Sequence, residues 1–101
     1  MIKVLIKQEE KKFVSLEVKG HANSAPYGED LVCSAVSAVL TGGLNNLDNP
    51  KDFDIKLDEG NAYVKAKDSI SSHDEIVMET IITSLKTIEE SYGKFIQIKN
   101  L

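Results

Sequence analysis

The sequence predicts an α+β fold, a two-layer sandwich in which two helices cover a mainly antiparallel sheet. Short segments in which apolar and polar residues alternate are typical of half-buried strands. Polar or glycine-containing turns join two pairs of these segments as hairpins. Two longer segments carry apolar residues at helical spacing. We therefore expect the order β-β-α-β-β-α-β in a single domain over residues 1–101.

The first hairpin is predicted at the start of the chain. Residues 2–7 and 13–19 form its two strands, and the polar residues between them form the turn. One face of the second strand carries the apolar residues Val14, Leu16 and Val18. That face is expected to lie against the core, and Gly20 ends the strand.

A loop without periodicity is followed by a helix of apolar and small residues. The loop covers residues 22–29, which include Asn, Ser, Pro and Gly. Asp30 is predicted as the N-cap, so the helix begins at Leu31 and runs to about Leu47. The pair Gly42-Gly43 in its second half either permits close packing or marks a local break.

The second half of the chain repeats the pattern of a hairpin followed by a helix. Residues 53–57 and 62–67 alternate around a turn and form the second hairpin, and residues 95–98 form a last short strand. Between them, Ser72 and Glu75 fit a capping box that starts the second helix with Ser72 as the N-cap. A sheet of this kind leaves an exposed edge, which favours a homodimer.

Charge and composition exclude several classes of function. The net charge is −4, and all twelve basic residues are lysines scattered among sixteen acidic ones. Nucleic-acid binding usually needs a clustered positive face, so we expect no direct nucleic-acid contact and instead a weak preference for a basic partner. No apolar run reaches the roughly 20 residues of a membrane span. One cysteine allows no internal disulfide, which is typical of a protein of the reducing cytoplasm.

The only cysteine, Cys33, and one of the two histidines, His21, are the residues best suited to chemistry. A cysteine nucleophile needs a base that takes the thiol proton or holds it in an ion pair. If Asp30 caps the helix, Cys33 is its third residue, where free backbone N–H groups stabilise a thiolate or an oxyanion. The competing interpretation is structural, because a free cysteine in an apolar helix is usually a small core residue.

Neighbouring polar residues allow two roles each. Asp30 could orient His21 as a carboxylate positions an imidazole, or it could only cap the helix, which is the favoured interpretation. Ser37 lies one turn after Cys33 and could hydrogen-bond a substrate or its own helix backbone. Tyr27 could contact a peptide or anchor the loop. No metal site is expected, because one cysteine and two distant histidines give no ligand cluster.

A sequence motif links these residues. The stretch Gly20-His21-Ala22 is followed by Tyr27-Gly28-Glu29-Asp30-Leu31-Val32-Cys33-Ser34-Ala35-Val36-Ser37. Together they resemble the bacterial ribosomal-processing cysteine protease family, called Prp, and the order of predicted elements agrees over essentially the whole chain. The pattern is fairly specific because it sets the nucleophile, the base and the loop length together.

The resemblance implies a function and roles for named residues. It implies a dyad of Cys33 as nucleophile and His21 as base, with no cofactor and no metal. It implies that the substrate is the precursor of large-subunit ribosomal protein twenty-seven, whose short N-terminal extension is removed. It further implies a homodimer and a mobile loop over residues 22–29, with Gly20 as a candidate hinge and Gly28 as part of the motif.

Two other functions compete with this one. A non-enzymatic ribosome-assembly or protein-interaction module would use the acidic surface to bind a basic ribosomal protein, and Cys33 would then be buried. A thiol-dependent acyl hydrolase for small molecules would need a preformed apolar pocket. Reactivity of Cys33 toward an alkylating reagent separates the module from the protease.

Overall fold

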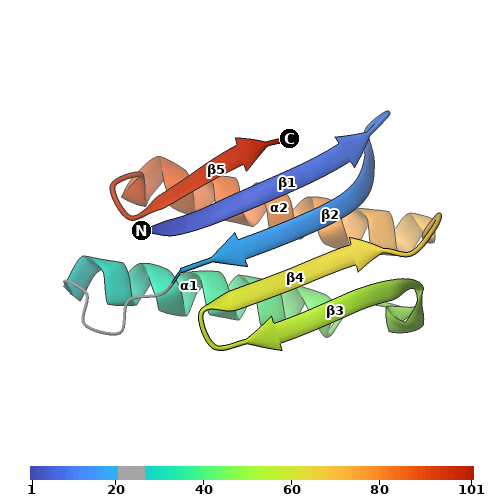
Figure 1. Cartoon of the computed structure of the whole chain (residues 1–101), viewed down its shortest axis with the longest axis horizontal. Coiled ribbons are helices and arrows are strands. Elements are labelled where there is room, and N and C mark those ends of the chain that lie inside the picture. Colours follow the sequence, from blue (N-terminus) through green and yellow to red (C-terminus); the bar gives the residue numbers. More distant parts are fainter. Residues whose placement is uncertain (21–26) are drawn as a thin grey trace.

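The structure is a computed structural model that describes residues 1–20 and 27–101. Within these residues a five-stranded sheet is covered on one face by two helices, so the predicted α+β sandwich is confirmed (Figure 1). The element order is also as predicted, and the strand boundaries differ from the expected ones by at most two residues. The elements are β1 (Ile2–Glu9), β2 (Lys12–Lys19), α1 (Tyr27–Leu44), a 3-10 turn (Pro50–Asp52), β3 (Phe53–Asp58), β4 (Asn61–Ala66), α2 (Ser72–Tyr92) and β5 (Ile96–Asn100).

The sheet has the spatial order β3-β4-β2-β1-β5. Neighbouring strands are antiparallel except β1 and β5, which pair in parallel with Ile2 opposite Ile96. The first and last strands of the chain therefore lie side by side (Figure 1). The β1–β2 hairpin closes through Glu10 and Lys11, whose φ values of 50° and 67° suit the left-handed two-residue turns that match strand twist.

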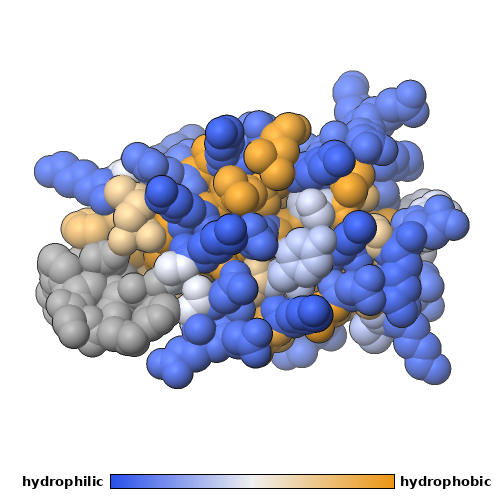
Figure 2. Space-filling model, viewed as in Figure 1, coloured by the Kyte–Doolittle hydropathy of each residue, from blue (hydrophilic) through white to orange (hydrophobic). Residues whose placement is uncertain are grey.

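The hydrophobic core lies between the sheet and the helices. Its largest fully buried side chains come from every layer, with Ile6 on β1, Leu16 on β2, and Met78 and Leu85 on α2. Figure 2 shows the opposite face of the sheet, where hydrophilic side chains surround a smaller apolar patch. This division explains the alternation in the sequence, because each strand turns successive residues toward core and solvent.

A β-bulge changes which residue of β2 faces the core. The register runs from Lys7 opposite Ser15 directly to Gln8 opposite Phe13, so Val14 has no partner on β1. Phe13 is consequently buried with 5% of its surface exposed, and Val14 is only half-buried. The prediction that Val14 shares the core face with Leu16 and Val18 was therefore wrong. One inserted residue reverses the alternation.

Helix α1 begins at Tyr27 and not at Leu31. Tyr27, Gly28 and Glu29, predicted as loop, are helical, and Asp30 is the fourth residue of the helix and not its N-cap. The rest of the predicted loop, residues 22–26, lies outside the described residues. The helix also ends at Leu44, three residues before the predicted end, and a turn follows at Asn45 and Asn46.

Close helix packing explains Gly43. A Cβ atom at Gly43 would lie 2.6 Å from Cδ1 of Ile81 on α2, and still closer to Cγ1 of the same side chain. A Cβ at Gly42 would meet nothing within 4 Å. Of the two predicted alternatives the structure shows close packing, because the helix continues through both glycines.

The start of α2 differs by one residue from the predicted capping box. Ser71, and not Ser72, is the N-cap, and its Oγ accepts a hydrogen bond of 3.1 Å from the N–H of Asp74. The Glu75 carboxylate reaches the N–H of Phe13 on β2 instead of the cap, at 3.0 Å. Asp74 is fully buried and accepts from the N–H groups of Asp48 and Asn49, which ties the segment after α1 to α2. Among the residues described, neither helix is long and apolar enough to cross a membrane.

Candidate active site

Cys33 lies in the second turn of α1, on the side of the helix that faces the sheet. It is a free cysteine, half-buried, and its side chain packs against the edge of the core. Cys33 is the seventh residue of the helix, not the third as expected from an N-cap at Asp30. Only the first four N–H groups of a helix lack an internal partner, so the expected role of the Cys33 N–H in holding an oxyanion loses its basis.

A small cavity of about 110 Å³ opens beside the Cys33 side chain. Gly20, at the end of β2, and Ser37, one turn after Cys33, line the same cavity. Three of the residues predicted for the site, Gly20, Cys33 and Ser37, are thus brought together. The apolar part of the wall is formed by Ile2, Val18, Val36, Leu40 and Ala62.

Gly20 is held in a conformation that suits only glycine. Its φ is +96°, and a Cβ atom there would lie 2.6 Å from the carbonyl oxygen of Met1. Its N–H donates a hydrogen bond of 2.9 Å to the carbonyl of Gly60 in the β3–β4 turn. The end of β2 is therefore bonded to the β3–β4 turn and lies close to Met1, at the wall of the Cys33 cavity.

The β3–β4 turn adds residues that the sequence argument missed. Asp58 and Asn61, on either side of this turn, line the Cys33 cavity together with Gly60. A carboxylate and a carboxamide are thus available beside the thiol. The turn itself is visible in the sequence, but only the pairing of β4 with β2 brings it to Cys33.

The remaining predicted residues are described only in part. His21 follows Gly20 directly in the sequence and lies outside the described residues. Tyr27, Gly28 and Asp30 belong to the first turn of α1. The structure therefore places one member of the expected dyad, and the position from which the chain continues toward the other.

A second polar cluster lies at the other end of α1. Asp48, His73 and Asp74 each offer one atom of a type that can bind a metal ion, and these atoms lie within 4.8 Å of one another. The His73 and Asp74 atoms already have hydrogen bonds, since Nε2–H of His73 donates to the carbonyl of Asn46 at 2.9 Å and both Asp74 oxygens accept backbone N–H groups. The carbonyl of Asn46 raises the pKa of His73, and the Asp48 and Asp74 carboxylates add to that effect. The cluster thus joins the segment that follows α1 to the start of α2.

Nearly the whole chain is similar to known proteins of one family. The family model for the cysteine protease Prp matches residues 1–97. The ribosomal processing cysteine protease Prp of Bacillus subtilis strain 168 is 36% identical over 101 residues, covering 91% of this chain and 90% of the relative. The protein of the same name from Staphylococcus aureus strain Mu50 is 32% identical over 97 residues, with 89% of each chain covered.

Solved structures show the same fold. The ribosomal processing protease Prp of S. aureus in complex with a substrate peptide superposes with a TM-score of 0.86 at 29% identity, and all of both chains is covered. The same protease with a covalently linked product peptide gives a TM-score of 0.83 at 30% identity, again over all of both chains.

Proposed function

Because the chain belongs to the cysteine protease Prp family, we propose that it removes the N-terminal extension of large-subunit ribosomal protein twenty-seven through a dyad of Cys33 and His21. The observation that carries the proposal is that the only cysteine of the chain lines a cavity with Gly20, the residue that precedes His21. The covalently linked product peptide in the S. aureus relative supports a covalent route.

The proposed reaction is acyl transfer through a thioester. His21 takes the proton of the Cys33 thiol, and Sγ attacks the scissile carbonyl carbon. The C–N bond breaks while His21 returns the proton to the leaving amine. A water molecule then attacks the thioester, giving a free carboxylate and restoring the thiol. No metal and no cofactor takes part in these steps.

The oxyanion needs donors other than the N–H of Cys33. The Ser37 hydroxyl and the Asn61 carboxamide are polar groups of the cavity wall that can donate hydrogen bonds. In this proposal Tyr27 and Gly28 contact the peptide, and Asp30 orients His21. The loss of Asp30 as a helix cap supports the orienting role over the capping role.

The test is a cleavage assay with a matched pair of variants. Wild type, Cys33→Ala and Ser34→Ala are mixed with a peptide that spans the extension junction, and the products are identified by mass spectrometry. Ser34 is an exposed residue of the same helix and does not line the cavity, which makes it the control. We expect one cut by wild type and Ser34→Ala and none by Cys33→Ala. Cleavage by Cys33→Ala would overturn the assignment of the nucleophile.

Alkylation separates the protease from a non-enzymatic interaction module. A protease needs a thiol that is both accessible and activated, so iodoacetamide should label Cys33 readily in the folded protein. His21→Asn should slow this labelling and abolish cleavage, because the base is lost. Slow labelling of wild type, together with no cut, would favour a ribosome-assembly or interaction module.

Partners and location complete the proposal. We expect a homodimer in the cytoplasm that contacts neither a membrane nor nucleic acid directly. Sedimentation of the purified protein over a range of concentrations measures the oligomeric state. A monomer at every concentration would contradict the homodimer.

A further inference from the structure

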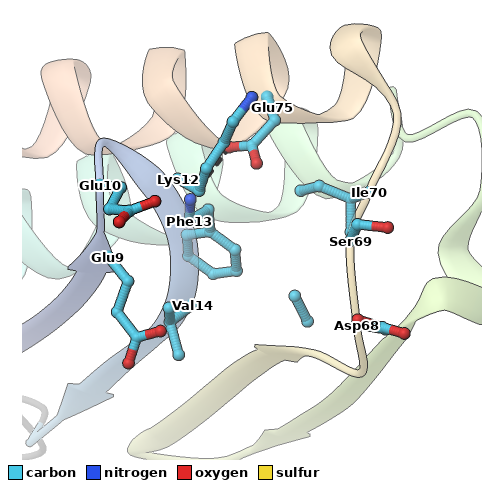
Figure 3. Close-up of a pocket in the computed structure, with 10 residues that line it drawn as sticks. Glu9, Glu10, Lys12, Phe13, Val14, Asp68, Ser69, Ile70 and Glu75 are labelled. Atoms are coloured by element: carbon cyan, nitrogen blue, oxygen red, sulfur yellow. Dashed lines mark hydrogen bonds between the residues drawn. The ribbon is translucent and has the colours of Figure 1, made fainter.

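A larger cavity, of about 840 Å³, lies at the opposite end of the sheet from Cys33. Figure 3 shows it between the β1–β2 hairpin on one side and residues 68–70, which lead into α2, on the other. The apolar side chains of Phe13, Val14, Ala66 and Ile70 contribute to its lining. No step of the proposed reaction uses this cavity.

The cavity forms where two neighbouring strands separate. The ladder between β2 and β4 ends at the pair Ser15 and Lys65, and β2 continues beyond it toward the hairpin turn. Phe13 forms the floor of the cavity and is held in place by two contacts. Its N–H donates to the Glu75 carboxylate, and the centroid of its ring lies 6.2 Å from that of Phe53. The bulge at Val14 is the feature that turns Phe13 into this position.

Carboxylates surround the apolar floor. Glu9, Glu10, Asp68 and Glu75 line the cavity, and Lys12 is the one lysine among its lining residues. Glu75 is held in place because one of its oxygens accepts the N–H of Phe13. Glu9 is exposed and its carboxylate lies 3.9 Å from Lys7, which makes a weak surface pair; Glu10 and Asp68 are exposed as well. An apolar floor with an acidic rim is complementary to a segment that carries both apolar and basic side chains.

The two cavities lie at the two ends of β2. Phe13 lines the larger one and Gly20 the Cys33 cavity. The seven residue steps between them span roughly 23 Å at the usual rise of a strand. A single extended segment of about that many residues reaches from one cavity to the other. The separation is therefore within the reach of a single protein substrate.

We propose that this cavity is a second binding site for the protein substrate, which takes a lysine- or arginine-bearing stretch outside the residues cleaved at Cys33. The proposal rests on the proteolytic function and adds to it a recognition step that does not touch the scissile bond. Binding there raises the affinity for the whole precursor over that for a short peptide, because the second contact is made within one complex. The electrostatic contribution of the acidic side chains to this binding weakens as salt is added.

The first test compares two substrates and two double variants of equal charge. Glu10→Gln with Asp68→Asn removes two exposed rim charges, and the control Asp54→Asn with Glu90→Gln removes two exposed charges elsewhere. The readout is the ratio of kcat/KM for the whole precursor to that for a short peptide spanning only the cut. We expect the rim variant to lower this ratio about five- to tenfold at low salt. The control should leave the ratio as in wild type, and an equal ratio for all three proteins overturns the proposal.

The second test does not depend on cleavage. A peptide from the mature part of the precursor, without the cut site, is titrated into isotope-labelled Cys33→Ala protein, and backbone amide shifts are followed by NMR. Shifts at Val14, Ser69 and Ile70 that the rim variant abolishes support the second site, even if wild type were to cut no substrate. The absence of shifts at these residues contradicts it.

Discussion

The N–H of Gly20 donates a 2.9 Å hydrogen bond to the carbonyl of Gly60, which joins the end of β2 to the β3–β4 turn. Both residues line the cavity beside Cys33. Because His21 follows Gly20 in the sequence, this bond sets the point from which the chain continues to the proposed base. The β3–β4 hairpin thus serves the site although it carries neither member of the proposed dyad.

Replacing Gly20 by alanine tests this relationship. Gly20→Ala should lower the free energy of unfolding by about 1–3 kcal/mol, because alanine is strained at a positive φ and its Cβ meets the carbonyl of Met1. Relieving the contact with Met1 would shift the end of β2, and this shift should reduce kcat/KM for the junction peptide. Urea denaturation and the cleavage assay measure the two effects. The control is Lys19→Ala at the exposed neighbouring position. It removes only a surface ion pair with Glu17, so it should change the free energy of unfolding by less than about 1 kcal/mol. Wild-type stability in Gly20→Ala would contradict the prediction.

The adjacent helix glycines should respond to alanine in opposite directions. Gly42→Ala should raise the free energy of unfolding by about 0.5–1 kcal/mol, since its Cβ meets open space and alanine favours the helix. Gly43→Ala should lower it by about 1–3 kcal/mol, because Ile81 is almost fully buried and has little room to move. Thermal and urea denaturation give both values. Ile81→Ala, which removes both Cγ1 and Cδ1, should cost less in the Gly43→Ala protein than in wild type. Equal costs would show that the two residues do not clash.

His73 should make stability depend on pH. The pKa of His73 is raised above 6.5, mainly by the carbonyl of Asn46, so the folded protein holds this proton more tightly than the unfolded chain. The stabilisation is fully present below pH 6.5 and is lost as the pH rises through the raised folded value. The free energy of unfolding, measured at a series of pH values on both sides of 6.5, should therefore fall in this window. His73→Gln should remove that part of the fall. An unchanged profile in the variant would assign the slope to other groups.

The element order and the two hairpins could be predicted because their signals are local, but the pairings between distant strands and the register could not. Alternation and turn residues lie within each hairpin, whereas the pairing of β1 with β5 joins distant parts of the chain. The bulge in β2 also could not be predicted from local sequence. Phe13 and Val14 are both apolar, and contacts with Phe53 and Glu75, far along the sequence, accompany the burial of Phe13.

The candidate site shows which sequence signals compete. Asp30 before an apolar run suggested a helix cap, yet the helix already includes Tyr27, and Asp30 is its fourth residue. Cys33, Ser37 and Gly20, singled out in the sequence for separate reasons, line one cavity in the structure. Asp58 and Asn61 were missed because nothing near them in the sequence points to Cys33.

The parallel pairing of β1 with β5 has a consequence for biosynthesis. β1 is translated well before β5, so the ladder beside Ile2, Val4 and Ile6 cannot close until Ile96–Asn100 has been made. At about 5–20 residues per second, β1 waits roughly 5–20 s for this partner. Throughout that interval a nascent hairpin with an open hydrogen-bonding edge is exposed to other chains. Pairing of β5 with β1 therefore completes the sheet only after the other four strands have been synthesised.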